Sequence, residues 1–287
     1  MIPTVNRSLR DSLSRLGLAD AAFWAYGLAS KVNPSVVITN SRYRRDGAPD
    51  RLPIPPSNLI FLVAGTADIS WFLKGGALAA ESITDAMRHI GAPVESLGSI
   101  LDFGCGCGRV LRHWHSLSHT RVCGVDYNPL LVEWCKGNLP FAEARTNQLS
   151  PPLPYGDSQF DLVYALSVFT HLTEDLQSSW VSELSRVVKP GGYLVISTHG
   201  ERYMHRLNEQ EKAQFESGRL VVKNNTKAPG SNMCSVYHPS AYVRDRMAAG
   251  LELVQFVPEG ARGNPKQDLY VLRKPTDQTH RADGPTT

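Results

Sequence analysis

The sequence has few cysteines, no long apolar run and no excess of charge of one sign. Its five cysteines include no C-x-x-C pair, which argues against a disulfide framework or a zinc ribbon and favours a reducing, cytoplasmic setting. No stretch reaches the roughly 18 uninterrupted apolar residues that a membrane-spanning helix needs. The N-terminal MIPTVNRSLRDSLSRLG lacks the apolar region of a secretory signal. We therefore expect a cytoplasmic protein without a membrane span.

The charge balance also excludes classes of partner. Lys and Arg number 30 and Asp and Glu 27, so the 287-residue chain carries a formal charge of only +3. Such a charge does not predict a nucleic-acid or anionic-membrane partner. Apolar residues make up 42% and charged residues 20%, which is ordinary globular composition and excludes wholesale disorder.

The N-terminal region is expected to pack on a larger domain. Apolar spacing predicts a helix over Leu9–Ser30 and another over Ala77–Ile90. Four prolines between them predict an extended loop over Arg42–Ser57. We divide the chain into an N-terminal segment, 1–90, a main domain, 91–275, and a disordered tail, 276–287.

From Ser99 onward, predicted strands alternate with predicted helices. The expected strands are Ser99–Phe103, Arg121–Asp126, Glu143–Asn147, Phe160–Leu166 and Tyr193–Thr198. The expected helices are Arg109–Ser118, Pro129–Asn138 and Glu174–Val188. This alternation predicts an α/β fold, a Rossmann-like, doubly wound parallel sheet with helices on both faces.

The alternation breaks after Gly200. A polar helix is expected over Glu201–Gly218, a hairpin over Arg219–Val222 and Met233–Tyr237, and a helix over Pro239–Ala249. Two closing strands, Leu251–Val257 and Gln267–Leu272, complete the domain. The stretch 201–239 is too short to bury a core of its own, so we interpret it as a lid that packs on the sheet.

The motif that carries chemistry is a glycine-rich turn between the first strand and the following helix. Asp102 is followed by Gly104, Gly106 and Gly108, which let the backbone approach a ligand without a Cβ in the way. Asp126 ends the next strand, where a carboxylate can accept both hydroxyls of a ribose. Strand, turn, helix, strand and terminal Asp together predict a nucleotide site.

Two common nucleotide motifs do not fit this turn. The dinucleotide fingerprint G-x-G-x-x-G would need its third glycine where Arg109 stands, which disfavours a nicotinamide-dependent reductase. No G-x-x-x-x-G-K-[ST] sequence occurs, so a P-loop is excluded as well.

Four blocks resemble the class I S-adenosylmethionine-dependent methyltransferases: ILDFGCGCGRV, GVDYNP, FDLVYALSVFTHL and ELSRVVKPGGYLVIS. They span Ser99–Ser197, about a third of the chain. The resemblance implies a seven-stranded sheet of order 3-2-1-4-5-7-6 whose seventh strand is antiparallel. It also implies S-adenosyl-L-methionine as cofactor. We assign no metal ligands, because Cys105 and Cys107 have no further ligands at suitable spacing.

The resemblance further implies which residues hold the cofactor. Asp102 and the three glycines would hold its amino-acid end, and Asp126 its ribose. Tyr127 would flank the adenine, and Asn147 and Gln148 would face the adenine edge. Leu166 and Ser167 would lie beneath the methionine part.

Methyl transfer to a hydroxyl also benefits from a base, typically by ~10²–10⁴-fold. The candidates are His171, His199 and His238, together with Glu201, all near the carboxyl edge of the expected sheet. For each histidine the alternative is a helix-capping or core residue. For Trp71, Phe72 and Lys74, the alternatives are a cap over the cofactor and simple packing.

We predict O-methylation of a small molecule or glycan. One alternative is a nucleic-acid or protein N-methyltransferase. The nucleic-acid enzymes carry [DN]-P-P-[YF] after the fourth strand, where this chain has Leu166-Ser167-Val168. The similar PPLPY, at Pro151–Tyr155, precedes that strand. The other alternative is a non-catalytic nucleotide-binding module of the same fold.

Overall fold

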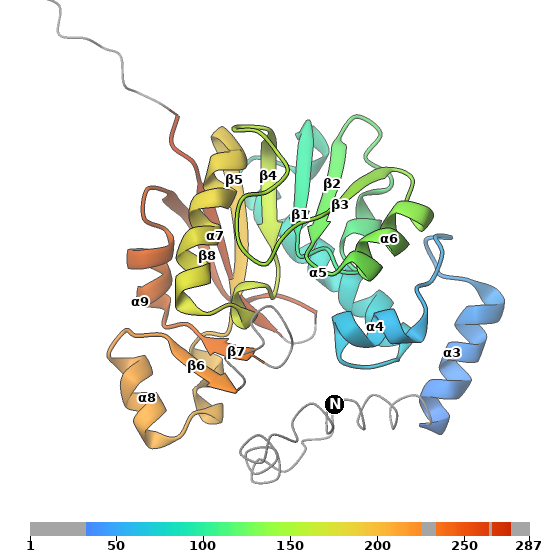
Figure 1. Cartoon of the computed structure of the whole chain (residues 1–287), viewed down its shortest axis with the longest axis horizontal. Coiled ribbons are helices and arrows are strands. Elements are labelled where there is room, and N and C mark those ends of the chain that lie inside the picture. The colour runs from blue at the N-terminus through green and yellow to red at the C-terminus, as the bar shows by residue number, and fades with distance from the viewer. Residues whose placement is uncertain (1–32, 225–233, 264–265, 277–287) are drawn as a thin grey trace, which may run out of the picture.

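The structure is a computed structural model, and it describes residues 33–224, 234–263 and 266–276. The helix predicted for Leu9–Ser30 and the tail beyond Thr276 lie outside the described residues. Figure 1 shows a central sheet flanked by helices. In that view α3 and α4 lie at the lower right of the sheet, and β6, β7 and α8 lie at its lower left.

The sheet has seven strands in the order β3-β2-β1-β4-β5-β9-β8. Their bounds are β1 Ser99–Phe103, β2 Arg121–Asp126, β3 Ala142–Thr146, β4 Phe160–Ala165, β5 Val188–Thr198, β8 Glu252–Ala261 and β9 Gln267–Arg273. Strands β1 to β5 run parallel, and β9 is antiparallel to both β5 and β8. Numbered within this sheet, the order is 3-2-1-4-5-7-6, so the predicted topology and antiparallel last strand are confirmed.

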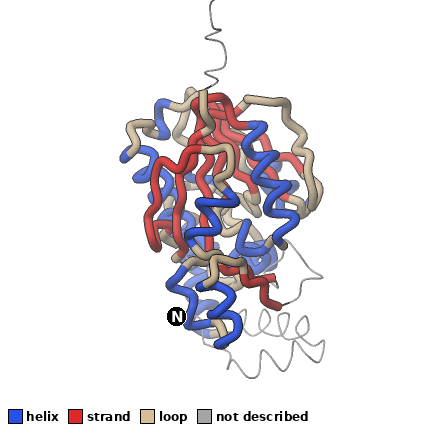
Figure 2. The backbone as a smooth tube through the Cα atoms, turned by 90° about the vertical axis from the view of Figure 1, so that its left-hand side faces the viewer, coloured by secondary structure: helices blue, strands red, loops and turns tan. Residues whose placement is uncertain are grey.

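Helices cover both faces of this sheet (Figure 2). The main ones are α3 Pro34–Asp46, α4 Ser57–Ala64, α5 Ile69–His89, α6 Pro129–Asn138, α7 Glu174–Val187 and α8 Glu209–Glu216. No single helix among the described residues is apolar and long enough to cross a membrane; α4 and α5 meet those criteria only as a pair, bent by 47°.

Alternating side chains of the strands build two cores. On β1, Leu101 and Phe103 point toward α7, and the Phe103 ring lies 4.5 Å from that of Trp180. Ile100 points to the opposite face, where it joins Ile83 of α5. Because both faces are covered at the centre of the sheet, β1 and β4 are buried along almost their whole length, whereas the edge strand β3 exposes Glu143 and Arg145.

The N-terminal region is more helical than the prolines suggested. The extended loop predicted for Arg42–Ser57 was wrong over its first part, since α3 runs to Asp46. Pro34 occupies the first turn of α3, where its missing N–H costs nothing, and the next proline comes only at 49. Asp68 caps α5 by accepting the N–H of Trp71, so that helix begins eight residues before Ala77.

A buried ion pair fixes the proline-rich loop to the main domain. Nε and Nη2 of Arg112 donate to the two carboxylate oxygens of Asp50 at 2.5 and 2.8 Å. The Arg112 side chain is fully buried, and that of Asp50 is 15% exposed. The arginine therefore holds the segment between α3 and α4 against the sheet domain.

The helix predicted for Arg109–Ser118 was also wrong. Only a short 3-10 helix, Leu111–Trp114, forms there. With three residues per turn, Leu111 and Trp114 share one face, and both are buried against the sheet.

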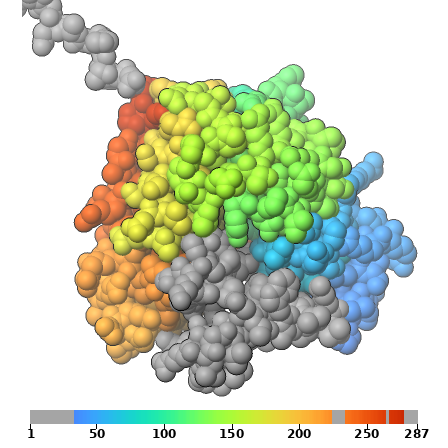
Figure 3. Space-filling model, in the orientation of Figure 1, coloured from blue at the N-terminus to red at the C-terminus, as the bar shows by residue number. Residues whose placement is uncertain are grey.

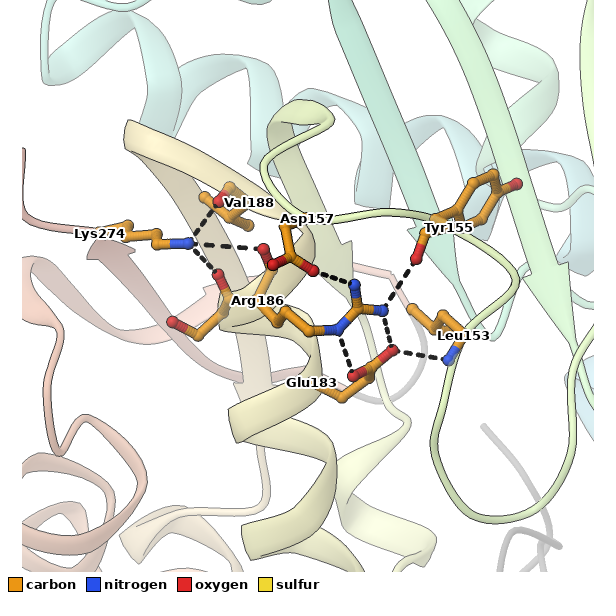
Figure 4. A network of polar contacts seen from close by, with 8 residues as sticks. Leu153, Tyr155, Asp157, Glu183, Arg186, Val188 and Lys274 are labelled. Carbon is orange, nitrogen blue, oxygen red and sulfur yellow. Dashed lines mark hydrogen bonds and ion pairs between the residues drawn. The ribbon is translucent and has the colours of Figure 1, made fainter.

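The opposite end of the sheet is held by backbone and side-chain contacts around the end of α7 (Figure 4). Arg186 donates to Glu183, to Asp157 at 2.6 Å and to the carbonyl of Tyr155 at 2.9 Å. Lys274, just after β9, donates to the carbonyls of Ser185 and Val188 at 2.8 Å. These bonds tie the end of α7 to the loop before β4 and to the segment after β9, far from the glycine turn.

After β5 the chain forms a compact subregion beside the carboxyl edge. The predicted helix Glu201–Gly218 is split into a 3-10 helix, Glu201–Arg206, and α8, because Asn208 starts a new helix with a capping box. The predicted hairpin forms as β6 Val221–Asn224 and β7 Cys234–Tyr237. The helix predicted at Pro239–Ala249 is a short α9, Ser240–Tyr242, followed by a π-helical turn.

This subregion buries more of its own surface than expected. A small apolar cluster forms within it from Tyr203, Leu207, Phe215, Val221 and Tyr237. It nevertheless joins the sheet, since Tyr237 forms a parallel bridge with His199 beyond β5, and the N–H of His238 donates to the His199 carbonyl. Figure 3 shows it as an orange lobe against the main domain.

Candidate functional site

The glycine turn lies at the carboxyl edge of the sheet, directly after β1. All three glycines have positive φ, at 80° for Gly104, 56° for Gly106 and 79° for Gly108. Glycine adopts this region without the steric cost that a Cβ imposes. The turn is fixed to β2, because the N–H groups of Gly104 and Cys105 both donate to the Val125 carbonyl.

Side chains of the protein, rather than open space, lie where Cβ atoms on these glycines would point. A Cβ on Gly106 would meet Val63 of α4 at 2.7 Å, and one on Gly104 would meet Val168 at 2.5 Å. The contact of the turn's backbone with a ligand stays a prediction. Here the glycines also allow α4 and the segment after β4 to pack closely on the turn.

Asp126 links the end of β2 to this turn. Its Oδ2 accepts the N–H of Gly106 and its Oδ1 accepts the N–H of Asn128, each at 2.9 Å. The carboxyl group is 8% exposed, and loss of hydration raises its pKa, against which the two backbone hydrogen bonds act. Each oxygen keeps a second lone pair for a further donor.

Asp102, on β1, has a buried carboxylate oxygen that lacks a donor. Oδ2 of Asp102 accepts no hydrogen bond from any residue that the structure describes, and the residue is 4% exposed. Burial raises its pKa to about 7, while a hydrogen bond with Tyr164 and the positive charge of Arg109 act in the opposite direction. A buried acceptor without a donor is costly and points to a missing partner.

A second such oxygen belongs to Asn147, just after β3. Its Nδ2 donates to the Gln148 carbonyl at 2.6 Å, and its buried Oδ1 has no donor in the described part of the chain. Tyr127, which follows Asp126, is 43% exposed. The predicted residues around β2 and β3 thus lie at the same sheet edge as the glycine turn.

The end of β4 has an unusual backbone conformation. Ser167 has φ 62°, a region that costs a non-glycine residue roughly 1–2 kcal/mol. Its N–H donates to Oγ of Ser197 at 2.8 Å, and Oγ of Ser197 donates to Gln267 at 2.6 Å. This network holds Ser167 and the preceding Leu166 at the carboxyl edge between β1 and β5.

The structure brings together the three predicted histidines. Nδ1 of His171 bonds the Cys234 carbonyl at 2.7 Å, and Nδ1 of His199 bonds the Val236 carbonyl at 3.1 Å. The two accepting carbonyls are two residues apart on β7, so this one strand orients both rings. A carbonyl can only accept, so each Nδ1 carries the proton and each Nε2 keeps a free lone pair.

His238 lies beside them, but its proton is on Nε2 rather than on Nδ1. Its Nε2 bonds Oε1 of Gln177 at 3.0 Å, and Nε2 of Gln177 donates to the carbonyls of Phe169 and Leu172. The glutamine oxygen is therefore the acceptor, and Nε2 of His238 carries the proton. The buried Nδ1 of His238 has no partner within residues 33–224, 234–263 and 266–276.

Burial keeps these rings neutral. Loss of hydration lowers the pKa of His199 and of His238 to about 3, and it lowers the pKa of His171 as well. His199 is 6% exposed and packs between Tyr203 and Tyr237, whereas His171 stays partly exposed. Of the three, His171 is therefore the most accessible to another molecule.

The other predicted candidates do not join this group of histidines. Glu201 is exposed, and its Oε1 accepts the N–H of Ser240 at the start of α9. Phe72 is fully buried among apolar residues of α4 and α5, and Lys74 is exposed. No group of three or more His, Cys, Asp or Glu side chains in the described part of the chain could hold a metal ion.

The sequence did not point to three residues that line a cavity together with Ser167. Arg109, Ser197 and Gln267 line a small cavity with Ser167. Arg109 follows the glycine turn directly, a position that signals closeness to the site. Gln267 lies in no motif, and only the pairing of β9 with β5 brings it there.

Comparison with known proteins places residues 101–196 in a methyltransferase domain family. The chain is 28% identical over 167 residues to a probable chloroplastic tocopherol O-methyltransferase of Oryza sativa, which covers 54% of this chain and 42% of the relative. It is 34% identical over 139 residues to a malonyl-[acyl-carrier protein] O-methyltransferase of Buchnera aphidicola, covering 45% and 52%. The match thus spans about half of each relative or less.

A solved structure of similar shape is an S-adenosylmethionine-dependent methyltransferase from Methanosarcina mazei. It is 19% identical, with a TM-score of 0.48, and the match covers 62% of this chain and 93% of the other.

Proposed function

The chain belongs to the class I S-adenosylmethionine-dependent methyltransferase family, and from that premise we propose that it methylates a hydroxyl group of a small molecule or glycan. The supporting observation is the group of three histidines beside the end of β4, of which His199 and His238 are buried and His171 is partly exposed.

The residues at the sheet edge fit the family's cofactor. Among the buried oxygens that have no donor within the described residues, those of Asp102 and Asn147 lie beside the glycine turn and the end of β3, and both are acceptors. S-adenosylmethionine carries two matching donors, an α-ammonium group and the adenine amino group. Asp102 would then bind the ammonium, and Asn147 the adenine edge with Gln148 beside it. Both match the roles implied by the sequence blocks.

The other contacts follow from the same arrangement. Asp126 would accept the ribose hydroxyls with its remaining lone pairs, and Tyr127 would cover one face of the adenine. Leu166 and Ser167 would lie beneath the methionine part. When bound, the cofactor supplies an electrophilic methyl group. The protein orients the acceptor in line with it and excludes water, and orientation of this kind is worth about 7–11 kcal/mol.

The histidines favour oxygen over nitrogen as the methylated atom. A hydroxyl becomes strongly acidic as its oxygen gains the methyl group, so a weak neutral base can take its proton. A protonated amine must lose its proton before attack, and a histidine whose pKa is lowered by burial removes it poorly. His171 is our proposed proton acceptor, through Nε2, while His199 and His238 hold β7 in place.

The segment Glu201–Pro239 would act as a lid in this scheme. Its strand β7 supplies the carbonyls that orient His171 and His199. Closing the lid would therefore also place the base. The rival nucleic-acid aminomethyltransferase would need a proline-rich aromatic motif after β4. Leu166-Ser167-Val168 offers none.

The test is a methylation assay with two matched panels of acceptors. Sugars, phenols and hydroxy acids form one panel, and the corresponding amines the other. Release of S-adenosylhomocysteine with hydroxyl acceptors alone supports the proposal. Release with amines alone would replace it with N-methylation, and tight cofactor binding without turnover on either panel would favour a non-catalytic module.

A further inference from the structure

A cavity at the end of β4 contains a cation, Arg109, that has no partner among the residues described by the structure. Its lining comes from the residue after the glycine turn, from α5, from the ends of β4 and β5, and from the β8–β9 connection. Arg109 extends into this space: its Nη1 lies 3.8 Å from the position that a Cβ on Gly263 would occupy. The arginine thus reaches from the turn after β1 to the far side of β5.

Arg109 forms no hydrogen bond or ion pair within the described part of the chain. The negative charge that acts on it most strongly is that of Asp102, but the two side chains form no ion pair. Arg262 lines the same cavity but differs, because its guanidinium donates to Asp85 at 2.5 Å and to Ser82 at 3.3 Å. A partly buried guanidinium without an acceptor is unfavourable unless a ligand supplies one.

The polar groups around Arg109 also present donors. Oγ of Ser197 uses its proton on Gln267 and accepts the N–H of Ser167, so it is fully engaged. Nε2 of Gln267 donates one proton to Oγ of Ser167 at 2.8 Å and keeps a second. Thr170 spends its proton on the Ser167 carbonyl, so the Ser167 hydroxyl is the donor in its long, 3.4 Å contact with Oγ1 of Thr170. A ligand oxygen at normal hydrogen-bond distance would be a better acceptor for that proton. An ionised carboxylate offers only acceptors and matches this set.

We propose that Arg109, with Ser167 and Gln267, forms a carboxylate-binding site at the methyl-transfer end of the sheet edge. This inference rests on the proposed function for the position of the reacting methyl group. The carboxylate has two possible sources with the same chemistry: the α-carboxylate of the cofactor, or an acid group on the acceptor. Arginine suits either, because its planar fork binds both oxygens of a carboxylate.

Malonate, a small dicarboxylate, probes the site directly. Thermal unfolding of the free wild-type protein and of Arg109→Gln is followed at constant ionic strength, with malonate replacing chloride. Malonate should raise the Tm of the wild type and lose this effect in Arg109→Gln. Arg262→Gln is the matched control: its guanidinium is already paired with α5, so the malonate effect should persist. An equal shift in wild type and Arg109→Gln, or no shift in either, overturns the proposal.

The source of the carboxylate is identified with S-adenosylhomocysteine and 5′-methylthioadenosine, which lacks the amino-acid group. If the cofactor supplies it, Arg109→Gln weakens S-adenosylhomocysteine binding by about tenfold or more and leaves methylthioadenosine unchanged. Bound S-adenosylhomocysteine then also removes the malonate shift. If the acceptor supplies it, Arg109→Gln leaves both affinities unchanged, and the malonate shift persists in the complex.

Equal weakening of both nucleotides, with a lower Tm, would identify Arg109 as a structural residue and overturn the proposal. Arg109→Lys should restore part of the malonate effect, because it keeps the charge without the fork. A wild-type protein that binds neither nucleotide would contradict the proposed function. The malonate experiment on the free protein would still decide the carboxylate site.

Discussion

The N–H of Gly106 donates a 2.9 Å hydrogen bond to Oδ2 of Asp126. One carboxylate therefore fixes the backbone of the glycine turn and remains able to accept further donors. The sequence places these residues twenty positions apart, and the parallel pairing of β1 with β2 brings them together. The shape of the turn and the proposed ribose contact thus depend on the same side chain.

Replacing Asp126 with Asn tests this shared role. The amide has one acceptor oxygen instead of two, so it cannot accept both backbone N–H groups and the ribose hydroxyls. We expect S-adenosylhomocysteine affinity to fall at least about tenfold, since hydrogen bonds to charged groups are worth ~1.5–3 kcal/mol each. Isothermal titration calorimetry measures this. Unchanged affinity in a folded variant would rule out Asp126 as the ribose ligand.

The raised pKa of Asp102 predicts pH-dependent cofactor binding. Burial puts this pKa at about 7 in the free protein, and an ammonium partner binds only the ionised form. Affinity for S-adenosylhomocysteine should therefore be highest above pH 7 and fall by up to about tenfold per pH unit below it. Methylthioadenosine, which lacks the ammonium, should show no such fall, and Asp102→Asn should flatten the profile. Parallel profiles for the two ligands would contradict the assignment.

His171→Asn separates the proposed base from its anchor. The asparagine Nδ2 can still donate to the Cys234 carbonyl, but the variant lacks the Nε2 lone pair. With an acceptor that supports turnover, kcat should fall by ~10²–10⁴-fold while S-adenosylhomocysteine affinity stays constant. Since burial lowers the pKa of His171 below its usual value, wild-type kcat should not change between pH 7 and 8 through this group. A kcat close to wild type would exclude His171 as the base.

The Asp50–Arg112 pair should control stability. Asp50→Ala leaves the fully buried Arg112 guanidinium without its carboxylate and should lower the free energy of unfolding by about 3–5 kcal/mol. Adding Arg112→Met to that variant should restore part of the loss, because no buried charge then remains unpaired. Denaturant unfolding of the single and double variants measures both effects. An additive, still larger loss in the double variant would contradict this explanation.

The sheet could be predicted because its strands are short, apolar and separated by clear turn signals. The bounds expected for Ser99–Phe103, Arg121–Asp126 and Pro129–Asn138 are those of β1, β2 and α6. Local pattern failed where distant residues decide. The segment after Gly108 becomes a 3-10 helix as Leu111 and Trp114 pack together on the sheet.

The site was predictable to a similar extent. Asp102, Asp126 and the glycines belong to a recognisable local motif, and the three histidines follow strand ends. That β7 orients two of them could not be foreseen, because it depends on how a hairpin some 35 residues beyond β5 packs on the sheet. The Ser167–Ser197–Gln267 network likewise joins three strands that no sequence spacing relates.

The central claim is that the carboxyl edge around the glycine turn binds S-adenosylmethionine. Titration of the full chain with S-adenosylhomocysteine, with NADH as the competing nucleotide, tests it most directly. We predict one-to-one binding of S-adenosylhomocysteine that Asp126→Asn weakens, and no binding of NADH. Failure of the folded wild-type protein to bind S-adenosylhomocysteine, or preferential binding of NADH, would contradict the claim.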